Sequence, residues 1–440
     1  MATTSFERGV RIGAAELSRA VDIIRASEEQ LTPLFQKIDS RTKFSLKKVI
    51  NAFRKYRVNP GLFAGGVDGY GHGDLGRETL DKIYAEIFGA ESALVRVQLF
   101  SGTHAIACAL YGVLRPGDKM LAISGPPYDT LEEVIGLREA ARTMTELDIG
   151  YDVVELTKDG LFDLDAINTV LKADEDERKI RVLHIQRSCG YSTRKSIPIK
   201  EIERLMTFIK KYYGHRHGKD LMVFADNCYG EFVEELEPTH VGVDLIAGSL
   251  IKNPGGGLAP SGGYIAGKRP FVKAAMNRLS SPGVSGGAAL GQKLRMFQGL
   301  FMAPTIVGES LKGAHLIAEV LGNQLGLECS PKSYSETNED RTDIIQSVVL
   351  GTEERVLSFC RAVQHMSPVD AHVKPVPGVT PGYGDPVVFA DGTFVFGSTI
   401  ELSADGPLRE PYSVYAQGCV HWTHWALVLE QALIDMKLAS

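Results

Sequence analysis

The chain has few cysteines, and their positions exclude several classes of protein. All six cysteines of the 440 residues stand apart in the sequence, without a C-x-x-C pair or a cluster with metal-ligand spacing. In a chain of this length such scatter argues for reduced thiols and against a disulfide framework. The sequence also lacks a run of about 18 apolar residues and an apolar stretch of signal-peptide length near its start. We therefore expect a cytoplasmic protein without a metal site.

An excess of positive charge is also absent. The formal net charge is −6, and charged residues make up 23% of the chain. Such a composition offers no electrostatic attraction to nucleic acid or to an anionic membrane. One basic stretch, residues 210–217, follows an amphipathic segment and precedes a predicted strand, which fits a solvated helix end. We therefore expect neither nucleic acid nor a membrane as a partner.

Apolar segments of strand length alternate with amphipathic helical segments through the middle of the chain. This alternation is typical of a mainly parallel sheet with helices on both faces, so we predict an α/β fold. The last third has shorter strands and a closing helix, which predicts a smaller C-terminal α+β domain. We predict an N-terminal helical arm, a large domain and this small domain, which span residues 1–60, 61–310 and 311–440. The predicted strands of the large domain are 94–100, 119–124, 181–187, 221–226, 245–250 and 263–266.

Two neighbouring predicted strands end in an acidic and a basic residue. One apolar run ends at Asp226, and the next is followed by Ser249-x-x-Lys252. A lysine amine can form a Schiff base with a cofactor aldehyde, and a carboxylate can hold a pyridine nitrogen protonated. Either residue alone is a common cap or turn residue. Together, at the ends of adjacent strands, they indicate a site for pyridoxal 5'-phosphate (PLP).

The junction Ser101-Gly102-Thr103 is a second candidate element. It lies between an apolar run and an alanine-rich helical segment, with a hydroxyl on each side of the glycine. A helix that begins here exposes free backbone N–H groups, and such an N-terminus binds anions such as phosphate. Ser249 offers a further hydroxyl to the same phosphate. Taken alone, the junction also fits a plain helix N-cap.

Aromatic and basic residues at other predicted strand ends complete the candidate site. Tyr128 follows a strand and can stack on a pyridine ring, and His104 is the competing ring. Arg409 lies in a loop of the small domain, where a guanidinium can bind a substrate carboxylate bidentately. Arg187 ends a central strand, and an arginine at such depth needs an anionic partner. That partner is the substrate, the cofactor or a structural carboxylate.

These motifs resemble those of the fold-type I PLP enzymes of the cystathionine lyase and methionine γ-lyase superfamily. The particular likeness is to the bacterial branch labelled aluminium-resistance or methionine γ-lyase-like proteins, and it covers most of the chain. The motifs that carry it are Phe-Ser101-Gly102-Thr103-His104-Ala, Gln186-Arg187-Ser188-x-Gly190-Tyr191, Ala-Asp226-Asn227-x-Tyr229-Gly-Glu231 and Ser249-x-x-Lys252-Asn-Pro-Gly-Gly-Gly.

The resemblance implies a role for each candidate residue. Lys252 forms the internal aldimine with PLP, and Asp226 pairs with the pyridinium nitrogen. The backbone of Gly102 and Thr103 holds the phosphate with help from Ser249, beside the N-cap residue Ser101.

The resemblance also implies contributions to the site from elsewhere. Tyr128 stacks on the ring. In the lyases a Tyr-x-Arg pair from the adjacent subunit completes the phosphate site, and the comparable place here reads Tyr70-Gly-His72. The role of the arginine therefore passes to His72, to nearby Arg77 or to no residue. We expect a homodimer or homotetramer with shared active sites.

The expected activity is that of a PLP-dependent carbon–sulfur lyase. It would eliminate the side-chain leaving group of a sulfur-containing α-amino acid of the methionine, cystathionine or cysteine type. Lys252 would take the α-proton as general base, and Tyr128 is the candidate acid. The alternatives are an amino-acid aldolase or decarboxylase with the same cofactor, and a non-catalytic protein on the same fold.

Overall fold

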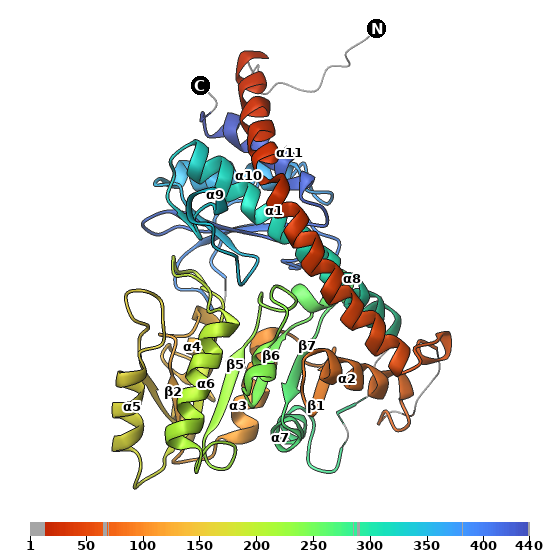
Figure 1. Ribbon diagram of the computed structural model, residues 1–440, viewed down its shortest axis with the longest axis vertical. Coiled ribbons are helices and arrows are strands. Elements are labelled where there is room, and N and C mark those ends of the chain that lie inside the picture. The colour runs from red at the N-terminus through yellow and green to blue at the C-terminus, as the bar shows by residue number, and fades with distance from the viewer. Residues whose placement is uncertain are drawn as a thin grey trace.

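The computed structural model describes residues 14–64, 68, 70–284, 286–287, 291–380 and 382–438. The first 13 residues of the predicted arm lie outside this part of the chain. Figure 1 shows a large sheet covered by helices, a smaller sheet with helices of its own, and two long helices that run along both. The predicted α/β fold with a small C-terminal α+β part is confirmed.

Seven strands form the large sheet in the order β1-β7-β6-β5-β4-β2-β3. All neighbours are parallel except β7, which is antiparallel to both β1 and β6. The edge strand β3 has no buried residue in its pattern, so no apolar run in the sequence marks it. The parallel strands end at one edge of the sheet, where sites of such folds lie. The strands are β1 (Ser92–Arg96), β2 (Lys119–Ala122), β3 (Gly150–Val153), β4 (Ile180–Gln186), β5 (Met222–Asp226), β6 (Leu245–Ser249) and β7 (Gly263–Gly267).

The central strands are apolar throughout because both faces of the sheet are covered. Along β5, Met222 and Phe224 belong to one core, whereas Val223 and Ala225 belong to the other. This alternation follows from the two-residue period of a strand. Helices α3, α4 and α7 contribute to the first core, and α2, α5 and α6 contribute to the second. Their bounds are α2 (Leu75–Ile87), α3 (Gly102–Val113), α4 (Asp129–Ile135), α5 (Leu164–Ala173), α6 (Ile199–Tyr213) and α7 (Arg269–Leu279).

The small sheet has five antiparallel strands in the order β10-β11-β12-β9-β8. Its apolar residues, for example Val388, Ala404 and Val414, join the core formed with helices α10 and α11. The bounds are β8 (Cys329–Ser330), β9 (Gln346–Val349), β10 (Val387–Ala390), β11 (Ser403–Pro407), β12 (Ser413–Gln417), α9 (Tyr334–Thr337), α10 (Glu353–His365) and α11 (Thr423–Asp435).

Two long helices connect the two parts. Helix α1 (Ala14–Lys55) packs along α8 (Lys293–Ile317), and it also contacts α2 of the large part and α11 of the small part (Figure 1). Helix α8 continues as a π-helical segment, Ala318–Gln324. Short 3-10 turns occur at Pro60–Leu62, Thr145–Leu147, Pro238–Val241 and Asn253–Gly255.

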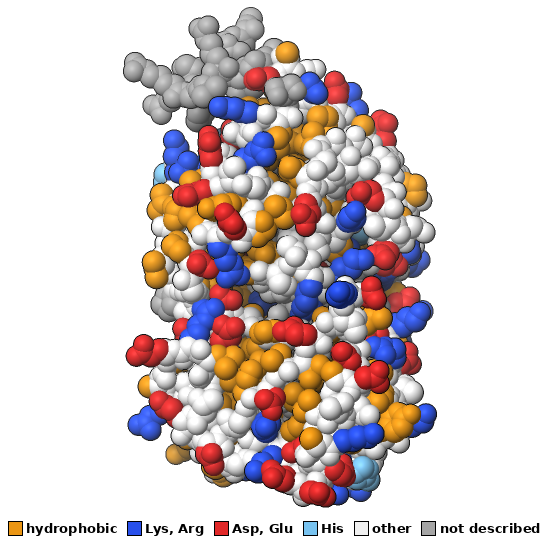
Figure 2. Space-filling model, turned by 90° about the vertical axis from the view of Figure 1, so that its left-hand side faces the viewer, with side chains coloured by type: hydrophobic (Ala, Val, Ile, Leu, Met, Phe, Trp, Pro, Cys, Tyr) orange, Lys and Arg blue, Asp and Glu red, His pale blue; other side chains and the backbone are white. Residues whose placement is uncertain are grey.

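The surface carries charges of both signs. On the face shown in Figure 2, the Lys and Arg side chains are interspersed with Asp and Glu side chains. Within the described residues, no helix is both long enough and apolar enough to cross a membrane.

Candidate functional site

A cavity of about 420 Å³ lies between the carboxyl ends of the large sheet and one face of the small sheet. Both parts of the chain supply residues to its wall. A volume of this size and a wall of mixed polar and aromatic residues are typical of a small-molecule site. The predicted site residues that line it are Ser101, Gly102, Thr103, Tyr128, Asp226, Ser249 and Lys252.

Asp226 and Lys252 reach the cavity from neighbouring parallel strands. Asp226 is the last residue of β5, is 3% exposed, and accepts a hydrogen bond from the backbone N–H of Cys228 at 3.0 Å. Lys252 follows β6 and precedes the turn Asn253–Gly255. That turn needs glycine, because a Cβ atom on Gly255 would lie 1.6 Å from the carbonyl oxygen of Leu250.

Lys252 is enclosed by groups that stabilise its charge. Its Nζ atom lies 4.1 Å from the centroid of the Tyr229 ring, a distance at which cation–π attraction operates. Burial opposes the charge, but Cys228, Tyr229 and Asp226 act in the other direction, and the pKa of Lys252 lies well above its ordinary value. Tyr229 itself has a φ of 71°, a strained backbone conformation that is often found at functional sites.

The start of α3 forms an anion site beside the lysine. The N-cap residue Ser101 accepts a hydrogen bond from the N–H of His104 at 3.1 Å, and no acceptor among the described residues binds the N–H groups of Gly102 and Thr103. A Cβ atom on Gly102 would lie 3.2 Å from the Cβ of Ser249. The glycine therefore lets the helix start and the end of β6 meet.

Tyr128 contacts the anion site and lies within the electrostatic influence of Asp226. It is the N-cap of α4, and its hydroxyl forms a hydrogen bond with Thr103 Oγ1 at 2.8 Å. Its backbone N–H donates to Gln186 Oε1 at 2.6 Å. Burial, followed by the charge of Asp226, raises the pKa of Tyr128, so the phenol keeps its proton at neutral pH. The competing residue His104 accepts from the N–H of Phe100 and stacks on the Phe100 ring, and it does not line the cavity.

The residues present fit PLP. The cofactor needs an amine for its aldehyde, a carboxylate for its ring nitrogen and N–H donors for its phosphate. The cavity contains Lys252, Asp226 and the free N–H groups at the start of α3.

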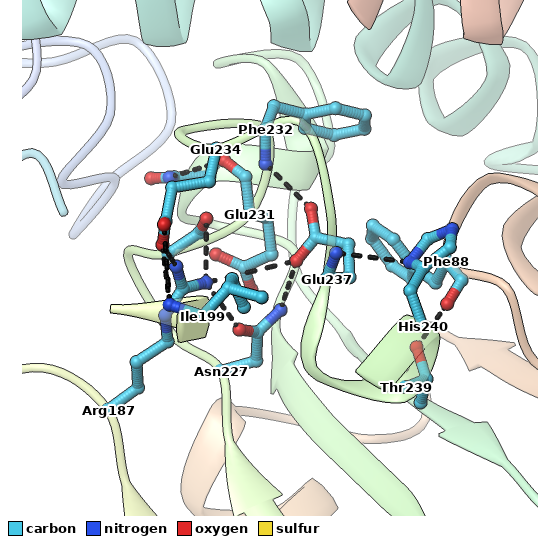
Figure 3. Close-up of polar contacts among 12 residues, drawn as sticks. Phe88, Arg187, Ile199, Asn227, Glu231, Phe232, Glu234, Glu237, Thr239 and His240 are labelled. Carbon is cyan, nitrogen blue, oxygen red and sulfur yellow. Dashed lines mark hydrogen bonds and ion pairs between the residues drawn. The ribbon is translucent and has the colours of Figure 1, made fainter. Parts of the chain in front are cut away.

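Arg187 does not line the cavity. Its side chain is 0% exposed, and Figure 3 shows its guanidinium beside Asn227 and Glu234. The guanidinium donates to Asn227 Oδ1 at 2.9 Å and to the carbonyl oxygen of Gly230 at 3.0 Å, and it also binds Glu234. Glu237 lies 3.9 Å away as a second anionic partner. The sequence left the substrate, the cofactor and a structural carboxylate open as the partner of Arg187. The structure shows structural carboxylates, and it does not support Arg187 as a ligand of the substrate.

Three other predicted residues also lie outside the cavity of their own chain. Tyr70 is 64% exposed, and the Nδ1 atom of His72 lies in hydrogen-bond contact with Asp68 Oδ2 at 2.8 Å. Arg409 binds Asp385 at 3.1 Å and donates to the carbonyl oxygen of Tyr191 at 3.3 Å. Tyr191 lines the cavity, so Arg409 lies one residue behind the wall.

The structure adds residues to which the sequence argument assigned no role. Tyr229 stands three residues after Asp226 in the motif Ala-Asp226-Asn227-x-Tyr229, and this position is a usable signal. Asp405 lines the cavity from the small sheet and accepts from the Tyr191 hydroxyl at 2.9 Å. Burial raises the pKa of Asp405 to about 6. No sequence signal marks Asp405, because an Asp-Gly pair usually indicates a turn.

Fold and cavity together define a PLP-dependent protein of fold type I. The chain resembles the structure of the PLP-dependent protein YhfS from Escherichia coli, with 16% identity, coverage of 90% of this chain and 96% of that one, and a TM-score of 0.57. At this identity the likeness concerns the fold.

The chain belongs to the methionine gamma-lyase family, which matches residues 20–437. It is 42% identical to the carbon–sulfur lyase involved in aluminium resistance from Clostridium novyi NT, over 95% of this chain and 96% of that one, with a TM-score of 0.87. It is also 47% identical to the uncharacterised protein YnbB of Bacillus subtilis, over 90% of this chain and 91% of that protein.

Proposed function

We propose that the chain is a PLP-dependent carbon–sulfur lyase that cleaves the side chain of a sulfur-containing α-amino acid. The observation that carries the proposal is the convergence of Lys252, Asp226 and the N-terminus of α3 on one cavity. Membership of the methionine gamma-lyase family supports a reaction of this class.

Each residue has a task that its surroundings support. PLP, when bound, supplies an electron sink for the substrate carbon that loses a proton. Lys252 would hold the cofactor and, once released by the substrate amine, take the α-proton at Nζ. Asp226 would keep the proton on the ring nitrogen, and Gly102 and Thr103 would bind the phosphate through their N–H groups.

Tyr128 is the proposed acid for the departing sulfur. Its hydroxyl is oriented by Thr103, and its raised pKa keeps the proton available at neutral pH. A thiolate that leaves the substrate requires such a donor, because a positioned acid accelerates its release.

We further propose that a second copy of the chain completes the site. Tyr70 and His72 are exposed and lie outside the cavity of their own chain, which suits a contribution to the phosphate site of a partner. Arg409 would release Asp385, its present ion-pair partner, and bind the substrate carboxylate in its place. We also propose a cytoplasmic location, which the six buried and free cysteines support.

The test begins with the visible absorbance of the purified protein. A band of bound PLP should be present in the wild type and in the exposed-lysine control Lys158→Ala, and absent in Lys252→Ala. Cysteine, homocysteine, methionine and cystathionine are then added one at a time, and keto acid, ammonia and thiol are measured. An active Lys252→Ala protein would contradict the proposal, and release of an aldehyde or carbon dioxide would favour the aldolase or decarboxylase.

A further inference from the structure

One wall of the cavity is a face of the small sheet. Ser403 and Asp405 are two residues apart on β11, so their side chains lie on the same face of the strand. They pair across the sheet with Gln417 and Tyr415 of β12, and all four residues line the cavity. We call this set the β11–β12 wall.

Polar atoms of the β11–β12 wall lack partners. Asp405 accepts from the Tyr191 hydroxyl at 2.9 Å and from Gln417 Nε2 at 3.4 Å, and both bonds use the same oxygen, Oδ2. No hydrogen bond or ion pair from a described residue reaches its Oδ1 atom. The hydroxyl of Ser403 is also without a partner, although this side chain is only 1% exposed. A buried hydroxyl and a carboxylate oxygen left open in a cavity point to a ligand with hydrogen-bond donors.

The charge of the cavity points to a cationic ligand. Lys252 is the single basic side chain among the described residues that line it. Of the acidic ones, Asp226 is assigned to the cofactor and Asp129 forms an ion pair with Arg138 at 3.3 Å. Asp391 and Asp405 remain, and neither forms an ion pair within the described chain.

Aromatic rings surround this position. The Tyr191 ring lies 5.6 Å from the Tyr383 ring and 5.0 Å from the Tyr415 ring, measured between centroids, and all three residues line the cavity. Aromatic faces attract an ammonium group, and a carboxylate beside them fixes its position. A neutral alkyl group would bury the Oδ1 atom of Asp405 without a hydrogen-bond donor, which costs free energy.

We propose that Asp405 determines specificity by binding a second ammonium group, carried on the sulfur substituent of the substrate. The preferred substrate class is then an amino acid whose thioether chain ends in an amine. This inference rests on the proposed lyase activity, in which the substrate α-amine meets the lysine side of the cavity. The remainder of the substrate then meets the β11–β12 wall.

The test compares two substrates that differ in one charged group. S-(2-Aminoethyl)-L-cysteine and S-propyl-L-cysteine have side chains of nearly equal size, and only the first carries a second ammonium. The holoenzyme, its Asp405→Asn variant and the control Asp159→Asn are assayed with both. Asn keeps the shape of the side chain and can still accept from Tyr191, while Asp159 is exposed and lies far from the cavity wall in sequence.

The wild type should show the higher kcat/KM for the amine-bearing substrate. Asp405→Asn should lower that value about tenfold to a hundredfold, the range expected when a charged hydrogen bond is lost. Its kcat/KM for S-propyl-L-cysteine should not fall, because the asparagine no longer places a charge beside the neutral alkyl group, and Asp159→Asn should resemble the wild type. An equal fall for both substrates, or no preference in the wild type, would overturn the proposal.

A binding measurement separates this inference from the lyase proposal. Each amino acid is titrated into the PLP-loaded protein and the shift of the visible band is followed, whether or not products form. A preference for the amine-bearing compound that disappears in Asp405→Asn supports the ammonium site even if the wild type cleaves neither compound. Cleavage of both compounds without such a preference supports the lyase and refutes the site.

Discussion

Replacing Arg187 by methionine tests whether this residue binds substrate or supports the structure. Its guanidinium is completely buried and binds Asn227, Glu234 and the carbonyl oxygens of Gly230 and Ile197. Methionine has a similar length and no charge. The substitution therefore removes the cation and leaves its partners in place.

The expected loss of stability follows from those partners. Glu237 is 2% exposed, and burial already raises its pKa while the charge of Arg187 lowers it. Removing one partner of a buried ion pair costs about 3–5 kcal/mol. We therefore expect Arg187→Met to lower the free energy of unfolding by about 3–5 kcal/mol.

The assay is a urea titration followed by circular dichroism, with Arg409→Met as the matched control. Arg409 is 39% exposed and binds Asp385 at the surface, so its loss should cost at most about 1 kcal/mol. If Arg187 bound the substrate, its replacement would instead raise KM and leave stability within about 1 kcal/mol of the wild type. That outcome would refute the structural reading of Arg187.

Two further predictions concern groups near the cofactor site. Burial raises the pKa of Glu231 from 4.5 to about 8. The stability that the protonated Glu231 contributes is therefore fully present below pH 4.5 and is lost as the pH rises toward 8. Between these values the free energy of unfolding should fall by about 1.4 kcal/mol per pH unit. Glu231→Gln should therefore become more stable relative to the wild type as the pH rises, in urea titrations at several pH values. Gly102→Ala should weaken PLP binding about tenfold in an absorbance titration, because the added methyl group meets Ser249 Cβ at 3.2 Å and Cys228 Sγ at 3.3 Å and shifts the helix start.

Each of these two predictions has a defined failure. A constant stability difference between Glu231→Gln and the wild type from pH 5 to pH 8 would show that the carboxyl group is ionised in the fold. For the glycine, the control is Gly378→Ala, since a Cβ atom there meets no atom within 4 Å. Equal PLP affinity of the Gly102 and Gly378 variants would mean that the start of α3 does not position the phosphate.

Local patterns in the sequence predict the fold class and several of the residues that line the cavity. Buried strands such as β5 and β6 appear in the sequence as continuous apolar runs, because helices cover both faces of the sheet. Polar residues directly after such runs, Asp226 and Lys252 among them, meet at one sheet edge because parallel strands end there. The domain boundaries predicted near residues 60 and 310 stay a prediction.

Other features depend on partners that are remote in the sequence. The strand β3 has partly and fully exposed residues and no apolar run, so the sequence does not mark it. The reversed direction of β7 is set by its neighbours on both sides and leaves no trace in its composition.

The sequence by itself therefore determined the α/β class and the residues that suit PLP, because strand periodicity and strand-end chemistry are local. Only the tertiary structure decided what Arg187 and Asp405 contact. Arg187 meets carboxylates that follow the next strand, and the Tyr191 hydroxyl meets Asp405 across 214 positions of the chain. An isolated arginine or aspartate in a sequence does not reveal whether it faces a buried side chain or an open cavity. The pairing of neighbouring strands brings the carboxylates to Arg187, and the packing of the two sheets brings the Tyr191 hydroxyl to Asp405.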